Sequence, residues 1–101
     1  MRVAQNPVHR FLAEWYQARL VGAPLADVAG RLIDQAAAAQ SRGTEVSVLL
    51  TVACPIDEMV FGVFRAETAE AVWQVCRDAD CAPDRITGGV SAYIAADDAA
   101  V

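Results

Sequence analysis

Residues 45–54 form a segment that is apolar on both faces if its backbone is extended. Successive side chains of a strand point to opposite faces of a sheet. The two faces carry these side chains: Val46, Val48, Leu50 and Val52 on one, and Ser47, Leu49, Thr51 and Ala53 on the other. The segment is also rich in β-branched residues, which favour strands. A strand of this composition must be covered on both sides, so the fold has to supply cover for both faces of a sheet.

Changes in the hydrophobic period along the chain predict the remaining elements. The predicted order is a strand at 11–17, a helix at 25–40, strands at 45–54 and 59–65, a second helix that starts at 69, and a last strand at 86–94. Helical spacing places the following apolar residues on the inner side of the first helix: Leu25, Val28, Ala29, Leu32, Ile33 and Ala36. The second helix has its own inner side: Ala69, Val72, Trp73, Cys76 and Ala79. Six elements in this order repeat the β-α-β unit twice.

Short local signals separate these elements. Gly22-Ala23-Pro24 breaks the chain before the first helix, and Pro55-Ile56-Asp57 is expected to form a hairpin turn. Thr68 is predicted to cap the second helix. Pro83 is expected to end that helix, and Gly88-Gly89 indicates a bulge or a bend within the last strand.

The duplicated β-α-β order is the split pattern of a ferredoxin-like α+β fold. We expect a four-stranded antiparallel sheet with two helices on one face. A chain of 101 residues supports one hydrophobic core. Residues 1–94 are therefore predicted to form a single domain, and the alanine-rich, acidic residues 95–101 a frayed tail.

Two helices of this length can cover only one face of such a sheet. The other face is also apolar, because both parities of residues 45–54 are apolar and residues 60–64 continue the pattern on the neighbouring strand. Exposing that face would leave an apolar patch larger than the few hundred Å² typical of monomers. A second copy of the chain is the simplest cover, which predicts a homodimer of the dimeric α/β-barrel type with a small cavity between its sheets.

Composition and charge exclude several partners. The net charge of −5 leaves no basic stripe for phosphates, so nucleic acid is not expected as a partner. Apolar stretches are far shorter than the ~20 residues that span a bilayer, and no leader-like start is present, so no membrane partner is expected either. The cysteines Cys54, Cys76 and Cys81 form no CxxC pair, which fits a reducing compartment and a cytoplasmic location.

Two polar side chains of the first strand are the main candidates for a binding site. Glu14 and Tyr16 alternate in phase with Leu12, so all three leave the same face. If that face looks into a cavity, the apolar surroundings raise the pKa of Glu14 and make it a ligand-binding group or a general base. The other interpretation is an ion pair between Glu14 and either Arg65 or Arg85 across the sheet.

Metal binding must be judged against the ligands present. His9 is the single histidine of the chain, so a His-rich site within one copy is excluded. A dimer axis could pair His9 with its counterpart and add carboxylates; otherwise His9 is an exposed residue at the edge of the strand. The three cysteines are interpreted as small buried hydrophobes, and Trp15 and Trp73 as core residues. Asp84 is expected to fix the turn into the last strand.

Short motifs also resemble a known family. They are Phe11-Leu12-Ala13-Glu14-Trp15-Tyr16, Cys54-Pro55-Ile56-Asp57-Glu58, Thr68-Ala69-Glu70-Ala71-Val72 and Asp84-Arg85-Ile86. They resemble motifs in a family of small actinobacterial-type proteins of unassigned function, which is related to the dimeric α/β-barrel superfamily and includes a nickel-binding protein. The resemblance covers roughly residues 10–94 and implies a bacterial protein of ferredoxin-like fold, with a divalent metal such as nickel as one candidate ligand.

Together these observations predict a small dimeric ligand-binding protein, with Glu14, Tyr16 and His9 as its polar candidates and a divalent metal, nickel by resemblance, as one ligand. The alternative is a cofactor-free enzyme, monooxygenase- or isomerase-like, with Glu14 as base. A third interpretation is a structural dimer or an interaction module. The sequence contains no complete Ser/His/Asp or Cys/His set, no glycine-rich phosphate loop and no redox motif.

Overall fold

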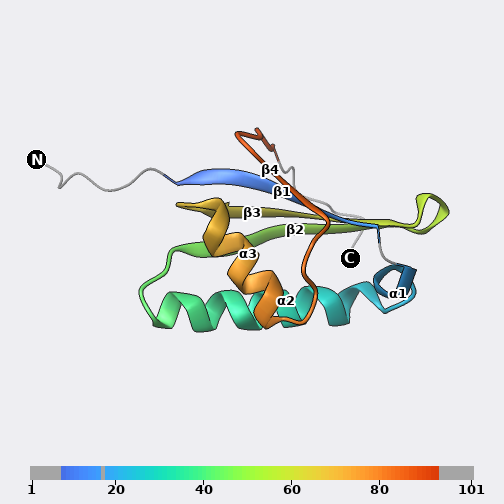
Figure 1. The fold of residues 1–101 in the computed structure, drawn as a ribbon, viewed down its shortest axis with the longest axis horizontal. Coiled ribbons are helices and arrows are strands. Elements are labelled where there is room, and N and C mark those ends of the chain that lie inside the picture. Colours follow the sequence, from blue (N-terminus) through green and yellow to red (C-terminus); the bar gives the residue numbers. More distant parts are fainter. Residues whose placement is uncertain (1–7, 17, 94–101) are drawn as a thin grey trace, which may run out of the picture.

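The computed structural model describes residues 8–16 and 18–93. The elements are β1 (His9–Trp15), α1 (Ala18–Val21), α2 (Leu25–Ser41), β2 (Val46–Cys54), the 3₁₀ turn η1 (Pro55–Asp57), β3 (Met59–Ala66), α3 (Ala69–Asp78) and β4 (Arg85–Gly88). The strands form one antiparallel sheet in the order β2-β3-β1-β4. The helices lie on one side of this sheet (Figure 1). The predicted ferredoxin-like α+β fold is confirmed.

The two long helices form where spacing and caps favour them. In α2, one buried stripe faces the sheet: Val28, Leu32, Ala36 and Ala39. Gly43, with φ +90°, follows the end of α2, and its N–H donates to the carbonyl of Gln40. At the start of α3, the Thr68 hydroxyl accepts a hydrogen bond from the Ala71 N–H at 3.2 Å. The predicted cap at Thr68 is confirmed.

Trp15 is the centre of the core on the helix side of the sheet. The side chains of Phe11, Ala13 and Trp15 are all buried on this side, and Trp15 is fully buried. The indole N–H of Trp15 donates a 2.7 Å hydrogen bond to the carbonyl oxygen of Cys81, so its one polar group is satisfied. The expectation that Trp15 is a core residue is confirmed. Trp73 is only half-buried on α3.

Two predictions about the helices were wrong in part, and one short helix was missed. The helix α3 ends at Asp78, well before Pro83, because the chain already turns at Asp80, whose φ is 58°. Ile33 was assigned to the inner side of the first helix, but 52% of its surface is exposed because α2 contacts the sheet along a narrower stripe. The short helix α1 was not predicted, since four residues carry too little periodicity to be recognised.

The first and last strands also differ from their predicted bounds. β1 begins at His9 and ends at Trp15, two residues earlier at each end than residues 11–17. β4 is confined to Arg85–Gly88 instead of residues 86–94. Gly89 follows it with φ +69° and forms a bend, which is one of the two alternatives expected for the glycine pair; this bend takes the chain out of the sheet and ends the strand. Gln17, Ile94 and the expected tail at 95–101 lie outside the described residues.

The close approach at Gly62 supplies a test of this packing. A Cβ at Gly62 would lie 3.1 Å from a ring carbon of Phe64 and 3.2 Å from one of Trp15, both fully buried side chains. We expect Gly62→Ala to lower the free energy of unfolding by about 1–3 kcal/mol, because rigid neighbours cannot move aside. Urea unfolding followed by circular dichroism measures this change.

Gly30→Ala is the matched control. Gly30 lies within α2, and a Cβ there meets nothing within 4 Å. The control should raise the free energy of unfolding by about 0.5–1 kcal/mol, because alanine favours the helix over glycine. Equal effects of the two substitutions would contradict the described packing around Trp15.

Candidate functional site

The face of the sheet opposite the helices, here called the open face, has an apolar row across its middle. Register pairs Leu50 with Val63, Val63 with Leu12, and Leu12 with Thr87, so these four residues cross all four strands. Leu50 keeps 39% of its surface exposed, although leucine is usually buried. Among the described residues, no helix covers this face (Figure 1). The observed faces of β2 and β3 therefore agree with the expectation that both sides of the sheet are apolar.

A β-bulge sets the register of β2 within this face. The pairing between β2 and β3 shifts between Val48 and Leu50, so Leu49 is an extra residue in the strand. Before the bulge Ser47 lies on the open face, and after it Leu50 and Val52 do. The strict alternation of even and odd residues expected for residues 45–54 therefore breaks at Leu49, and Leu50 lies on the face opposite to Val46.

Two further rows lie on either side of the apolar row. On one side, Ser47 pairs with Arg65, and Arg65 pairs with Arg10. On the other side, the row contains Val52, Phe61, Glu14 and Arg85. The open face is thus basic at one end, apolar in the middle, and aromatic with an acid–base pair at the other end.

Glu14 and Tyr16 meet at this second end, as their phase in the sequence predicts. The hydroxyl of Tyr16 donates a 2.9 Å hydrogen bond to Oε1 of Glu14. The other carboxylate oxygen, Oε2, lies 3.6 Å from Nε of Arg85. Only 13% of the Glu14 side chain is exposed, whereas the Arg85 side chain is 66% exposed. Of the two arginines that could pair with Glu14, Arg85 does so, because it lies directly opposite Glu14 on β4. On β3 the residue opposite Glu14 is Phe61, and Arg65 lies opposite Arg10.

Asp84 holds this cluster in place from the chain entering β4. Its carboxylate accepts a 2.7 Å hydrogen bond from the backbone N–H of Tyr16, and its own N–H donates at 2.8 Å to the carbonyl of Glu14. These two bonds tie the end of β1 to the start of β4. The prediction that Asp84 fixes the turn into the last strand is confirmed, and its contact with Tyr16 makes it part of the site.

The hydrogen bond between Tyr16 and Glu14 has a consequence for acid–base chemistry. Because it accepts a hydrogen bond from the hydroxyl, the Glu14 carboxylate raises the pKa of Tyr16 above its ordinary value of about 10. Tyr16 is therefore a neutral hydrogen-bond donor over the physiological pH range. The pair presents one phenol and one carboxyl group side by side at the rim of an apolar surface.

His9 does not join this cluster. It is the first residue of β1 and shares the parity of Phe11 and Trp15, so it lies on the helix side of the sheet and at the far end of the strand from Glu14. Its ring is exposed and packs edge-on against Phe11, with ring centroids 6.4 Å apart. The structure therefore separates the three candidates into a pair, Glu14 and Tyr16, and an isolated edge histidine.

The cysteines and the acidic residues do not assemble a metal site within one copy. Within residues 8–16 and 18–93, no three His, Cys, Asp or Glu side chains gather where one ion could contact them. Burial raises the pKa of Cys76 to about 12, which keeps it a thiol and a poor ligand. Cys81 is also buried, and Cys54 is half-buried on the open face. Within one copy, the donor set of these described residues does not fit nickel or zinc.

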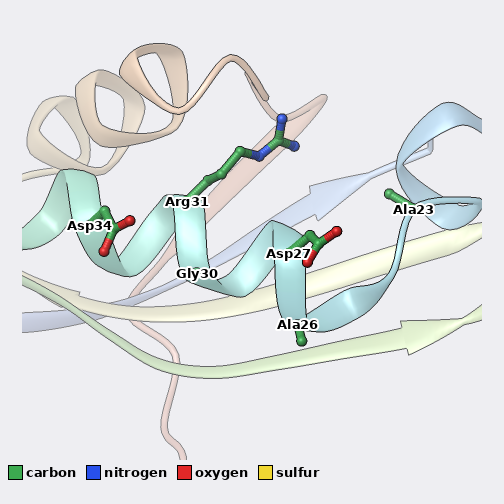
Figure 2. A pocket seen from close by; sticks show the side chains of 6 residues that line it. All are labelled: Ala23, Ala26, Asp27, Gly30, Arg31 and Asp34. Carbon is green, nitrogen blue, oxygen red and sulfur yellow. The ribbon is translucent and has the colours of Figure 1, made fainter.

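Two hollows on the helix side of the molecule are lined by neither Glu14 nor Tyr16. One of about 530 Å³ runs along α2 and is lined by Ala23, Ala26, Asp27, Gly30, Arg31 and Asp34. Figure 2 shows Arg31 extending away from the helix, with the two carboxylates pointing elsewhere. Another, of about 280 Å³, lies between the end of α2 and the start of α3. The polar side chains of the first hollow do not point toward one another, as those of ligand sites do.

The sequence predicted neither a site role for Arg10 nor its position opposite Arg65 on the open face. Arg10 and Arg65 face each other across β1 and β3, and this can be recognised only when the register of the two strands is known. The parity of Arg10 relative to Leu12 and Glu14 was a usable signal, since all three residues are even-numbered on one strand.

No helix of the described ranges is both long and apolar enough to cross a membrane.

Titration of Tyr16 tests the geometry of the site. The chain has two tyrosines, so a Tyr93→Phe background leaves Tyr16 as the reporter. We expect its phenolate absorbance to appear at a pH above the ordinary value of about 10. Glu14→Gln in this background should bring the pKa down, because the carboxylate that favours the neutral phenol is gone.

The effect on stability has a defined sign. Because the folded pKa of Tyr16 is raised, the hydrogen bond stabilises the fold below the ordinary pKa and is lost as pH rises through the raised one. An unchanged Tyr16 pKa after Glu14→Gln would show that the two side chains do not interact in solution.

Comparisons with protein-family models, with curated proteins and with solved structures found no match for this chain. The resemblance to the family with a nickel-binding member therefore stays a prediction.

Proposed function

We propose that the protein is a homodimer whose two open faces pack together and bind a small organic ligand beside Glu14 and Tyr16. The observation that carries this proposal is a mostly buried carboxylate, with a phenol bonded to it, at the rim of an apolar sheet face that no helix of the described residues covers. A site of few polar groups on a largely apolar wall is the usual composition of small-molecule sites.

The apolar face supports the dimer part of the proposal. These side chains of β2 and β3 lie on it: Leu50, Val52, Cys54, Met59, Phe61 and Val63. Together with Leu12 they form one contiguous apolar surface across three strands. Burying it against an identical surface gains ~25 cal/mol for each Å² removed from water, which is the main driving force for association of proteins.

The polar end supports the ligand part. Glu14 can accept a hydrogen bond, and the Tyr16 hydroxyl, whose proton is donated to Glu14, can accept one, while Phe61 on the neighbouring strand offers an aromatic wall. Packing of a second sheet at ~10 Å leaves room for a flat or short-chain molecule wherever the side chains are small. The expected ligand has an apolar body and at least one group that hydrogen-bonds to the carboxyl of Glu14.

Two other functions receive less support. Binding of nickel or another divalent metal would need a set of donor side chains that the described residues do not bring together, because His9 lies on the opposite face from Glu14.

A cofactor-free enzyme with Glu14 as base is favoured by one observation, the direct Tyr16–Glu14 hydrogen bond, which places a proton donor beside a proton acceptor. Arg85 opposes it, since its guanidinium already lies 3.6 Å from the second carboxylate oxygen, Oε2.

We also propose a cytoplasmic location. The support is chemical: the chain has three cysteines, and Cys54, Cys76 and Cys81 form no disulfide with one another. A reducing compartment keeps cysteines in this state.

The dimer is tested by solution mass and one matched pair of variants. Light scattering behind a sizing column should give twice the chain mass of 10.7 kDa. Leu50→Lys should give the single-chain mass, because it places two ammonium groups within the apolar contact. Ile33→Lys is the control, since Ile33 is a similarly exposed apolar residue on α2. A monomeric parent protein would overturn the proposal.

Ligand binding is tested by thermal shift across a panel of small aromatic and aliphatic alcohols, amines and acids. A ligand that binds only the native state raises the melting temperature by linkage. We expect at least one compound class to raise it for the parent protein and for Tyr93→Phe, but not for Glu14→Gln. A response that survives Glu14→Gln would move the binding site away from the Glu14–Tyr16 pair.

A further inference from the structure

Arg10 and Arg65 form an unfavourable pair on the open face. They lie directly opposite each other on β1 and β3, and both are exposed. Neither makes an ion pair or a side-chain hydrogen bond with any described residue. Like charges directly opposite on neighbouring strands destabilise a sheet, so this arrangement calls for an anionic partner beyond the described residues of one copy.

A suitable carboxylate lies on the same face of the same strand. Glu14 is four residues from Arg10, or ~13 Å along β1, too far for a contact within one copy. The apolar row through Leu12 lies midway between them. On β1, the open face therefore carries a guanidinium and a carboxylate at equal distances on either side of Leu12.

Rotation by half a turn about the apolar row converts this pattern into a complementary one. An axis that runs along the row, between two facing sheets, reverses the direction of each strand and places it over its own counterpart. Arg10 of the second copy then faces Glu14, and Arg65 of the second copy faces Phe61. The first contact is an ion pair, and the second is a guanidinium over an aromatic ring.

The other symmetric way of stacking the two faces lacks this match. An axis parallel to the strands leaves their direction unchanged, so the Arg10–Arg65 end of one copy meets the same end of the other. Four guanidinium groups would then gather in one place without a carboxylate among the described residues of that row. Charge thus selects one of the two arrangements.

We propose that the two copies meet with their β1 strands antiparallel, so that Arg10 and Arg65 of the second copy complete the site at Glu14 and Tyr16. This inference rests on the proposed dimer and names the residues that the second copy contributes. Each end of the interface then holds Glu14, Tyr16 and Arg85 from one copy and two guanidinium groups from the other, so the binding site does not exist in a single chain.

Cross-linking between two marked chains tests the arrangement. One chain carries Arg10→Cys and the other Glu14→Cys, both with Cys54→Ser to remove the half-buried thiol of the open face. A bismaleimide that spans the ~10 Å between facing sheets is added to the mixed, refolded chains. We expect the product to join the two different chains, and products joining two Arg10→Cys chains to be absent. Mass spectrometry distinguishes these products.

Two further chain sets keep the test decisive. Leu12→Cys, again with Cys54→Ser, lies near the proposed axis and should cross-link to its own copy whenever the open faces meet. Phe61→Cys mixed with Arg65→Cys repeats the test on β3, in case the β1 variants do not fold.

The outcomes separate this inference from the proposed dimer. Cross-links between two Arg10→Cys chains, or Leu12→Cys cross-links without the mixed products on either strand, would overturn the composite site and leave the dimer standing. A single-chain mass for the parent protein without Leu12→Cys cross-links would overturn both. Mixed products on β1 or β3, with no Arg10→Cys homodimer product, are the result that supports the inference.

Discussion

Burial of Trp15 decides which way every other side chain of β1 points. The indole fills the space between the sheet and the helices, where Gly62 admits its ring and the Cys81 carbonyl accepts its N–H. With Trp15 inside, strand alternation forces Glu14 outward. The bond to Cys81 also fixes the loop that leads to Asp84 and Arg85, so one buried side chain positions both halves of the polar cluster. A slip of one residue in β1 would exchange the core and the binding surface.

The same parity leaves the sheet with unequal faces. The helix face buries its apolar residues within the chain, while the open face presents an apolar band bounded by charge at both ends. Apolar area explains why such a face needs a partner, but it does not specify orientation, because hydrophobic association is non-directional. Orientation has to come from the arginines at one end and the acid at the other, which is the usual division between affinity and specificity.

Much of the fold could be predicted from periodicity, since the helix stripe around Val28 and Leu32 and the doubly apolar β2 are local patterns. The common face of Glu14 and Tyr16 was predictable for the same reason. The order of the strands in the sheet and the register between them could not be predicted. Whether Glu14 meets Arg65 or Arg85 depends on which strand lies on which side of β1, and the opposition of Arg10 and Arg65 depends on register. Neither is encoded in the spacing of one segment. The early end of β4 at Gly88 likewise follows from the backbone angle at Gly89, which either a bulge or a terminus could produce.

The bulge at Leu49 has a consequence for how the chain avoids misassembly. β2 is an edge strand, and Val46–Cys54 contains no charged residue and no proline, so its outer backbone groups could template the growth of a continuous sheet with other molecules. An extra residue in the middle interrupts the regular repeat of donors and acceptors along that edge and twists it. An incoming strand can therefore match only half of β2 at a time. The irregularity that sets the open face thus also guards the edge of the sheet against aggregation.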